Sequence, residues 1–376
     1  MKTAYFYLTP QGKALAERLC AGHPGDLYGK THFKENMQEA FLKYDNLVCI
    51  MATGIVFRIL APMVVHKTSD PAVVVLDQEG RHAISLLSGH LGGANDLARE
   101  MAWLAGGDPV ITTATDVAGI ISFDSFAKSH NMAIENIGQL KHISGALLEG
   151  RKVRVISNYQ FEEFKSQPLI LETLSDNQPE RKDFDSAPDA LPVCRPDKKG
   201  ERTESLDGLP DQAHSPSDQR ECCPTVVIDE GFCLKEASNQ PVLYLRPRTI
   251  CAGIGCKRNM DGPAIEASLL QTLKEEGLSP LSLKCISTIP LKADEAGILS
   301  TAEHLKVPVR IIDTEEIDRL ELSALGIAGS DFVAANTGVL SVSTASSYLA
   351  AGRGRILRDK ARYKGITIAL SLAELT

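Results

Sequence analysis

Residues 86–98, LLSGHLGGANDLA, place a serine, a histidine, three glycines and an Asn-Asp pair in one short stretch. Each glycine costs about 1 kcal/mol relative to alanine inside a helix, so this run suits a turn better than a helix. We predict a glycine-rich turn at Gly89, Gly92 and Gly93, between a strand and a helix, where free backbone N–H groups could bind an anion. A tight turn required only for packing is the alternative.

Three polar side chains accompany this turn, namely Ser88, His90 and Asn95. The ordinary pKa of histidine, about 6.5, suits proton transfer near neutral pH. We therefore predict that His90 is a general base beside an oxyanion site formed by the backbone amides. Ser88 is a further catalytic candidate, and Asn95 is a candidate for substrate binding. The competing interpretation is that His90 only hydrogen-bonds the turn.

Side-chain oxygens also cluster after the next predicted strand, in the sequence TTATD. Ligands of open α/β sheets bind at the carboxyl ends of strands, so we expect this group to face a ligand. Asp116 is a catalytic candidate and the second choice for the base, and the binding candidates are Thr112, Thr113 and Thr115. Helix capping and turn formation by threonine and aspartate would explain the same residues without a ligand.

The net charge of −8 argues against nucleic acid and anionic membranes as partners, so an anionic ligand would need a local group of cations. The segments ATGIVFR, HKTSDP and GIGCKR supply cations or glycines of this kind. GIGCKR is predicted to be a strand entering a glycine turn, but Arg258 stands where a dinucleotide fingerprint would place its third glycine, which weakens that interpretation. The predicted binding residues in these segments are Thr53, Gly54, Arg58, Lys67, Gly253, Gly255, Lys257 and Arg258.

The elements that must position these residues alternate between strand-like and helix-like segments, which is typical of α/β domains with largely parallel sheets. We predict two such domains, an N-terminal one over residues 1–125 and a C-terminal one over residues 247–376. Residues 126–246 form a variable middle region between them. Within it, residues 175–224 are rich in proline, aspartate and serine and lack apolar periodicity, so we predict a flexible linker there.

The spacing of the cysteines and the hydropathy of the chain indicate its cellular compartment. Nine cysteines without a CxxC or His-paired spacing fit reduced thiols in the cytoplasm better than disulfides or a zinc site. No apolar run approaches the roughly 20 residues that cross a bilayer, and the first residues lack the apolar segment of a signal peptide. We expect a cytoplasmic protein with no membrane partner and no metal ligated by the chain itself.

Taken together and in order, the N-terminal motifs resemble a known family. ATGIVFRILAP, HKTSDPAVVVLDQEG, SLLSGHLGGANDLA and VITTATD are similar to the N-terminal domain of the cobalt-precorrin-5A hydrolases of anaerobic cobalamin biosynthesis. GIGCKR, LKADE, VPVR and GVLSV resemble the C-terminal domain of the same family. The resemblance spans roughly residues 1–125 and 247–370. One departure lies in the last motif, where the family tends toward an acidic residue and this chain has Ser343 and Thr344.

The resemblance implies a hydrolase acting on a cobalt macrocycle fringed with acetate and propionate groups. Water would open a lactone between ring A and the meso carbon C20, and the two-carbon unit would leave as acetaldehyde, giving cobalt-precorrin-5B. One base could serve both steps. The substrate carries the cobalt, so we expect the protein to use no cofactor. Other enzymes of the cobalamin pathway are candidate partners beside the tetrapyrrole itself.

Two other classes of function stay open from the sequence alone. A nucleotide-dependent α/β enzyme could use Gly89–Gly93 or Gly253–Gly255 to bind phosphate. A non-catalytic tetrapyrrole carrier would bind the corrinoid without releasing acetaldehyde. Nucleotide binding would favour the first class, and tight corrinoid binding without turnover would favour the second.

Overall fold

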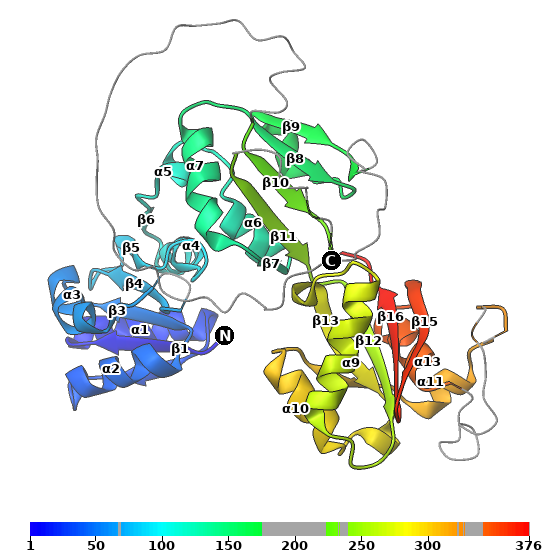
Figure 1. The fold of residues 1–376 in the computed structure, drawn as a ribbon. Coiled ribbons are helices and arrows are strands. Elements are labelled where there is room, and N and C mark those ends of the chain that lie inside the picture. The colour runs from blue at the N-terminus through cyan, green and yellow to red at the C-terminus, as the bar shows by residue number, and fades with distance from the viewer. Residues whose placement is uncertain are drawn as a thin grey trace, which may run out of the picture.

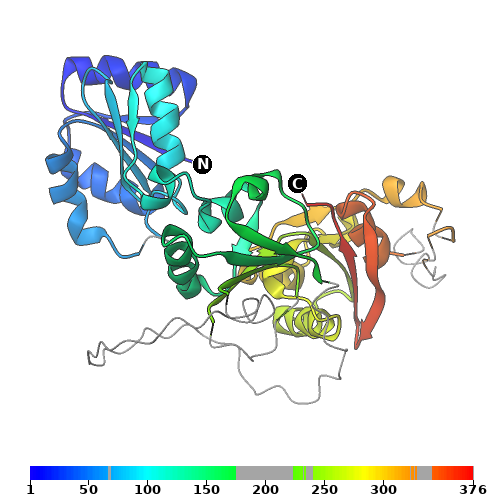
Figure 2. The same cartoon turned by 90° about the horizontal axis from the view of Figure 1, so that it is seen from above.

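The computed structural model describes residues 1–66, 69–174, 223–231, 233, 240–321, 323–325, 327 and 341–375. These residues form three β-sheets with flanking helices, which follow one another from the N-terminal to the C-terminal part of the chain (Figures 1 and 2). Most neighbouring strands are parallel, so the predicted α/β class is confirmed. In this part of the chain, no helix is long and apolar enough to cross a membrane. Lys67 and residues 175–222 of the predicted linker lie outside the described residues.

The first sheet has the strand order β2-β1-β3-β4-β5-β6 and is covered by helices on both faces. Its buried strands are short runs of aliphatic and aromatic residues, as expected for strands enclosed on both sides. The strands are β1 (Thr3–Tyr7), β2 (Asp26–Tyr28), β3 (Asn46–Ile50), β4 (Ala72–Leu76), β5 (His82–Leu87) and β6 (Asp108–Val110), and the helices are α1 (Pro10–Gly22), α2 (Phe33–Lys43), α3 (Thr53–Leu60), the 3₁₀ turn η1 (Ala61–Met63) and α4 (Ala94–Ala105).

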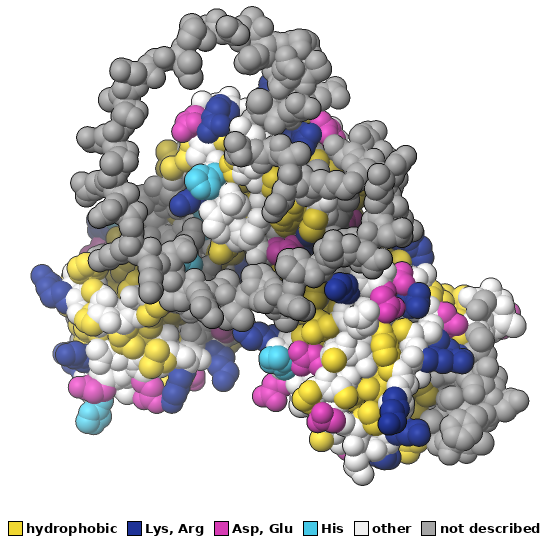
Figure 3. All heavy atoms as spheres, viewed as in Figure 1, with side chains coloured by type: hydrophobic (Ala, Val, Ile, Leu, Met, Phe, Trp, Pro, Cys, Tyr) yellow, Lys and Arg dark blue, Asp and Glu magenta, His cyan; other side chains and the backbone are white. Residues whose placement is uncertain are grey.

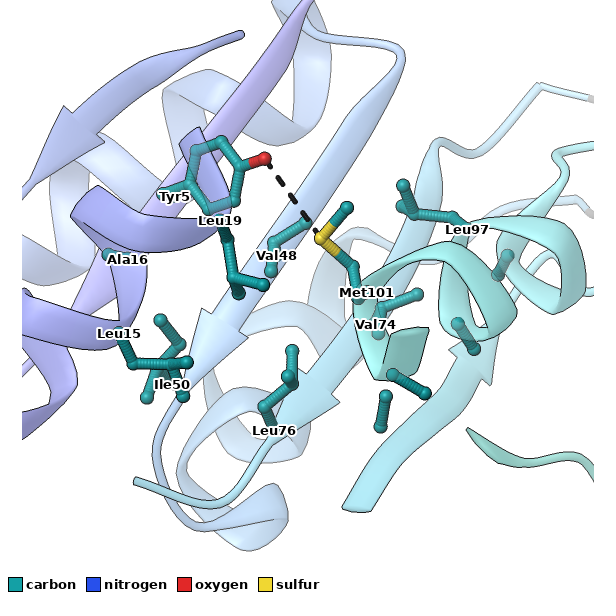
Figure 4. Close-up of a cluster of buried hydrophobic side chains, with 14 of the residues drawn as sticks. Tyr5, Leu15, Ala16, Leu19, Val48, Ile50, Val74, Leu76, Leu97 and Met101 are labelled. Atoms are coloured by element: carbon teal, nitrogen blue, oxygen red, sulfur yellow. Dashed lines mark hydrogen bonds between the residues drawn. The ribbon is translucent and has the colours of Figure 1, made fainter. Parts of the chain in front are cut away.

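One core of this sheet fixes the helix that carries the predicted turn. Figure 4 shows Leu19 of α1 and Met101 of α4 on the same face of the sheet, with the Tyr5 hydroxyl directed at the Met101 sulfur. These two atoms lie 4.0 Å apart. Leu97 and Met101 are four residues apart on α4 and therefore share the face that packs on the strands. The opposite, polar face of α4 is left to contact the residues that follow β6.

The direction of the strands changes between β4 and β5, which are antiparallel. Only residues 77–81 join them, too few for the crossover that a parallel pair would need. The Asp77 side chain accepts hydrogen bonds from the backbone N–H groups of Glu79 and His82, and Gly80 takes a φ of 73°. Because β5 and β6 are parallel to each other, both end at the edge of the sheet where β4 begins.

A second sheet, with the order β7-β11-β10-β8-β9, is formed within the middle region. The sequence predicted only a variable region with a linker there, so this sheet was not anticipated. Phe123 and Phe126 of α6 pack against Val153, Val226 and Leu243 in its core. Its elements are α5 (Ala114–Val117), α6 (Phe123–Ser129), β7 (Met132–Ile134), η2 (Ile137–Gln139), α7 (Leu140–Leu148), β8 (Val153–Ser157), η3 (Glu162–Ser166), β9 (Leu169–Glu172), β10 (Thr225–Ile228) and β11 (Val242–Pro247).

The third sheet has the order β14-β13-β12-β16-β15 and again carries helices on both faces. In Figure 3, basic and acidic side chains are interspersed over the visible surface of the first and third sheet regions. The elements are β12 (Ile250–Cys256), α9 (Gly262–Glu275), η5 (Pro280–Ser282), β13 (Leu283–Thr288), η6 (Pro290–Lys292), α10 (Ala296–His304), β14 (Val309–Ile311), α11 (Thr314–Asp318), α13 (Ser343–Ala350), β15 (Arg355–Tyr363) and β16 (Ile366–Leu372).

The prediction of a glycine turn in GIGCKR is wrong. Gly253 and Gly255 lie inside β12, where they pair with β16 and, for Gly253, also with β13. A Cβ atom on Gly253 would lie 1.8 Å from the carbonyl oxygen of Ser343. The glycine therefore lets α13 approach β12 closely, and no bare turn is available there for a phosphate.

Candidate active site

The turn between β5 and α4 forms as predicted, but each of its glycines has a local packing reason. A Cβ on Gly92 would lie 2.3 Å from the Ser88 Cβ, and one on Gly89 would lie 2.7 Å from the Asn95 Oδ1. Gly93 has a φ of 94° and precedes the first residue of α4. Two of the amides are used within the turn, since Ala94 N–H donates to Ser88 O and Asn95 N–H to Gly89 O. The turn is a compact loop that fixes the position of His90.

His90 lies between two carboxylates. Its Nε2 is 2.8 Å from Asp116 Oδ2, and its Nδ1 is 3.3 Å from Asp124 Oδ1. The Thr115 hydroxyl lies 3.4 Å from the same Nε2. The side chain of His90 is 15% exposed, so the imidazole is enclosed but reachable from solvent. Both ring nitrogens thus have an acidic partner in the ligand-free structure.

These contacts set the protonation states of the group. The Asp124 carboxylate, followed by Asp116, raises the pKa of His90 above its ordinary value against the opposing effect of burial. Burial acts to raise the pKa of Asp116, but hydrogen bonds from His90 and Arg99 outweigh it and lower that pKa. The pKa of Asp124 is lowered in the same way, with burial opposed by His90 and Ser122. His90 is therefore favoured as an imidazolium between two carboxylates, whereas the sequence analysis expected a neutral base.

Asp116 is held by two side chains of α4. Asn95 Nδ2 donates to its Oδ2 at 2.9 Å, and Arg99 Nη2 donates to its Oδ1 at 2.6 Å. Asn95 and Arg99 are four residues apart, so they lie on one face of the helix. Asn95 also bonds to Ser85 and Thr113, which ties β5, α4 and the segment after β6 together.

The other predicted residues of this region differ in how far they are exposed. Asn95 is buried and its amide is fully engaged, so it positions Asp116 instead of facing a ligand. Ser88 has a φ of 58° and is 8% exposed, and its Oγ has no hydrogen-bond partner among the described residues. Thr115 is also buried. Thr113 is half-buried against Asn95, and Thr112 is exposed beside it. Whether Ser88, His90 and Asp116 take part in catalysis stays a prediction.

Thr53, Gly54 and Arg58 are not brought to this group. Ile50, the end of β3, pairs with Leu76, and Leu76 pairs with Ala83 near the start of β5. Thr53 therefore follows the edge at which β5 begins, roughly 17 Å along the strand from its other end. Arg58 Nη1 donates to Gly54 O, so its guanidinium is directed toward the same far edge.

Lys257 and Arg258 also lie apart, at the carboxyl end of β12 in the third sheet. Arg258 is ion-paired with Asp294 at 2.8 Å and donates to the Leu291 carbonyl. It thus binds the LKADE segment, and its charge is already balanced. Lys257 is exposed. Arg58, Lys257 and Arg258 are therefore not brought together at the His90 group, and Lys67, the fourth predicted cation, lies outside the described residues.

Three site residues were missed by the sequence analysis: Arg99, Asp124 and Lys128. Arg99 could have been found, because the i,i+4 spacing from Asn95 places it on the polar face of a predicted helix. Asp124 and Lys128 lie on α6, whose core belongs to the second sheet, so their contact with the turn depends on tertiary structure. Lys128 Nζ donates to Gly92 O at 3.0 Å. In the described part of the chain, no group of three or more His, Cys, Asp or Glu residues has the arrangement of a metal site.

Comparison with known proteins decides the family. Three family models cover most of the chain: Cobalamin synthesis G N-terminal over residues 35–116, Cobalamin biosynthesis central region over 121–247, and Cobalamin synthesis G C-terminus over 250–371. A Salmonella typhimurium protein named cobalt-precorrin-5A hydrolase is 33% identical over 98% of this chain and 97% of its own length. The chain belongs to the cobalamin synthesis G family.

A second curated protein and one solved structure are also similar to this chain. A cobalt-precorrin-5A hydrolase of Priestia megaterium is 30% identical over 88% of this chain and 79% of its own. A solved cobalamin biosynthesis protein G homolog from Sulfolobus solfataricus is 20% identical, covers 99% of this chain and 97% of its own, and has a TM-score of 0.35. The boundary between the N-terminal and central family models falls between Asp116 and Asp124, so the residues around His90 come from both.

Proposed function

We propose that the chain is a cobalt-precorrin-5A hydrolase, which opens the ring A lactone of its substrate with water and releases the C20 two-carbon unit as acetaldehyde, leaving cobalt-precorrin-5B. The observation that carries the proposal is the enclosed Asp116–His90–Asp124 group in a chain that aligns with a hydrolase of this name along nearly its full length. A proton donor and a proton acceptor in contact are what lactone opening requires.

In the first step, water adds to the lactone carbonyl carbon and gives a proton to Asp116. The lactone's ring oxygen leaves that carbon and takes a proton from His90 Nε2. The products are a free carboxyl group on the ring A side chain and a hydroxyl group on the two-carbon unit at C20. A histidine with a raised pKa is suited to this donation, because a larger fraction of it is protonated near neutral pH than of an ordinary histidine.

In the second step, the now neutral His90 takes the proton back from the new hydroxyl group. The carbon–carbon bond to the macrocycle breaks as the carbonyl of acetaldehyde forms, and the electron pair passes into the conjugated ring, which takes up a proton. Asp116, protonated in the first step, can supply that proton. One histidine thus serves as acid and then as base.

The anionic fringe of such a substrate needs cations, and two are found at the turn. Arg99 is 48% exposed beside Asp116, and Lys128 reaches the Gly92 carbonyl. Each retains donors for a substrate carboxylate. The cobalt arrives with the macrocycle, and we infer that the chain adds no cofactor of its own. We also infer that it acts in the cytoplasm next to other enzymes of the cobalamin pathway.

The test is to incubate the purified chain with cobalt-precorrin-5A and to measure acetaldehyde with a coupled alcohol dehydrogenase assay. We expect one acetaldehyde per macrocycle over repeated turnovers. Corrinoid binding without acetaldehyde release would contradict the proposal and favour a carrier. Matched incubations with and without added nucleotide should give equal rates, and a requirement for nucleotide would also contradict it.

A further inference from the structure

The helix α6 belongs to the second sheet but contacts the catalytic turn of the first. Phe123, Phe126 and Ala127 are part of the core formed with β8, β10 and β11, and Figure 1 shows α6 beside β7 and β11. Two other side chains of the helix, Asp124 and Lys128, are four residues apart and therefore lie on one face. Both reach the turn, Asp124 at His90 and Lys128 at Gly92.

The Asp124 side chain is held in place by hydrogen bonds from its own segment of the chain, in addition to its contact with His90. Its side chain is 6% exposed, and its Oδ1 accepts hydrogen bonds from the Ser122 hydroxyl and from the Ser125 backbone N–H. A buried carboxylate with a lowered pKa is charged at neutral pH and needs a positive partner. His90 Nδ1 supplies it. The acceptor for this ring nitrogen is thus fixed by α6 and not by the turn that carries the histidine.

Lys128 fixes the other side of the turn. Besides its bond to the Gly92 carbonyl, its Nζ would lie 2.4 Å from a Cβ atom on Gly93. A side chain at position 93 would therefore displace the ammonium group as well as strain a backbone with a φ of 94°. The same face of α6 therefore contacts the turn at two places, with Asp124 at His90 and Lys128 at Gly92.

We propose that Asp124 is a positioning residue for the reaction, so that the second sheet completes an active site whose reacting groups lie on the first. Asp124 holds the Nδ1 proton and the plane of the imidazole, which leaves Nε2 directed at Asp116 and at the substrate. The arrangement follows the general logic of a carboxylate that orients a catalytic histidine. This inference rests on the proposed function and adds a role to a residue outside the turn.

Among the described residues, the charged groups on the elements around His90 come from α4, α5 and α6. They are Asp116 on α5, Asp124 and Lys128 on α6, and Arg99 with its partner Asp96 on α4. Among them only Asp124 contacts Nδ1. Its removal should therefore change the tautomer and the titration of His90 in a way that loss of the other groups would not.

The experiment uses the full chain with Asp124→Asn and, as a matched control, Asp77→Asn. Asp77 also accepts backbone hydrogen bonds and has a lowered pKa, but it lies in the β4–β5 turn away from His90. The ¹H–¹⁵N spectrum of the histidine side chains, with His90→Gln used to assign the His90 signals, gives the pKa and the tautomer. Acetaldehyde release gives kcat and KM.

We expect Asp124→Asn to lower the His90 pKa, to mix its tautomers, and to reduce kcat about a hundredfold with KM changed less than about threefold. Asp124→Glu should recover part of kcat, and Asp77→Asn should match the parent chain in both readouts. If Asp124→Asn does not fold, the same spectrum and kcat are measured on Asp124→Glu, for which we expect a shifted His90 titration and a reduced kcat.

An unchanged His90 titration and a parental kcat in the folded variant would overturn the positioning role. If the proposed function itself is wrong, the experiment gives a different result. In that case His90→Gln would release acetaldehyde as the parent does, or the parent would release none, whatever the spectrum of Asp124→Asn shows.

Discussion

The Nε2 atom of His90 lies 2.8 Å from Oδ2 of Asp116, although 26 residues separate the two in the chain. They meet because β5 and β6 are parallel neighbours that end at the same edge of the sheet, with Ile84 paired to Val110. His90 follows the first strand and Asp116 follows the second. Because the hairpin between β4 and β5 reverses the chain, β5 and β6 end at the edge of the sheet opposite to the one where β3 ends.

The ion pairs of His90 should make stability depend on pH. The folded-state pKa of His90 lies above its unfolded value, so its contribution is fully present below about pH 6.5 and is lost as pH rises through the raised pKa. The lowered pKa values of Asp116 and Asp124 cause the opposite loss as pH falls below about 4. The free energy lost in His90→Gln, about 1–3 kcal/mol, should therefore be largest near pH 5 and smaller at pH 9. Urea unfolding at both pH values checks this, and a loss that grows with pH would contradict it.

Arg99 should matter through Asp116. Arg99→Gln removes one of the two side chains of α4 that hold this carboxylate, so the pKa of Asp116 should rise and kcat/KM should fall about tenfold. The low-pH limb of the rate profile should move toward higher pH. Arg81→Gln is the control, because Arg81 pairs with Glu79 in the β4–β5 turn. Equal profiles for the two variants would leave Arg99 without this role.

Lys128 and Arg58 should differ in substrate binding. Lys128 lies at the turn, whereas Arg58 is directed toward the opposite edge of the first sheet. We expect Lys128→Ala to raise KM severalfold, with an effect that shrinks as salt is added, and Arg58→Ala to leave KM near the parental value. Steady-state kinetics at two ionic strengths measures both. A larger KM change for Arg58→Ala than for Lys128→Ala would show that the substrate lies elsewhere.

Gly92 should tolerate no side chain. A Cβ there would lie 2.3 Å from that of Ser88, so Gly92→Ala should destabilise the fold by about 1–3 kcal/mol and displace His90. Gly145 of α7 has open space around its Cβ position, so Gly145→Ala should stabilise by about 0.5–1 kcal/mol. Thermal unfolding of both variants distinguishes a crowded turn from a general intolerance of alanine. Destabilisation by both to the same extent would contradict the packing argument.

The sequence predicted the local features of this molecule better than its long-range ones. The strand, turn and helix around His90, and the polar group ending in Asp116, could be recognised because glycine, histidine and threonine patterns are local. The reversal at β5 was not predicted, although Asp77–Gly80 is an ordinary hairpin turn, and it leaves Thr53 and Arg58 at the opposite edge of the sheet from His90. Asp124 had no local signal, because its contact with His90 depends on the tertiary packing of α6 against the turn after β5. In GIGCKR, Gly253 allows α13 to approach β12 closely and does not form a turn.

The central claim is that His90 carries protons in lactone opening and in carbon–carbon cleavage. Its most direct test is single-turnover acetaldehyde release by His90→Gln at saturating cobalt-precorrin-5A, with corrinoid binding and circular dichroism measured on the same sample. The account predicts a folded protein that binds the macrocycle and releases acetaldehyde at least a hundredfold more slowly than the parent chain. Release at the parental rate by the folded variant would contradict it and would leave Asp116 as the acid–base group.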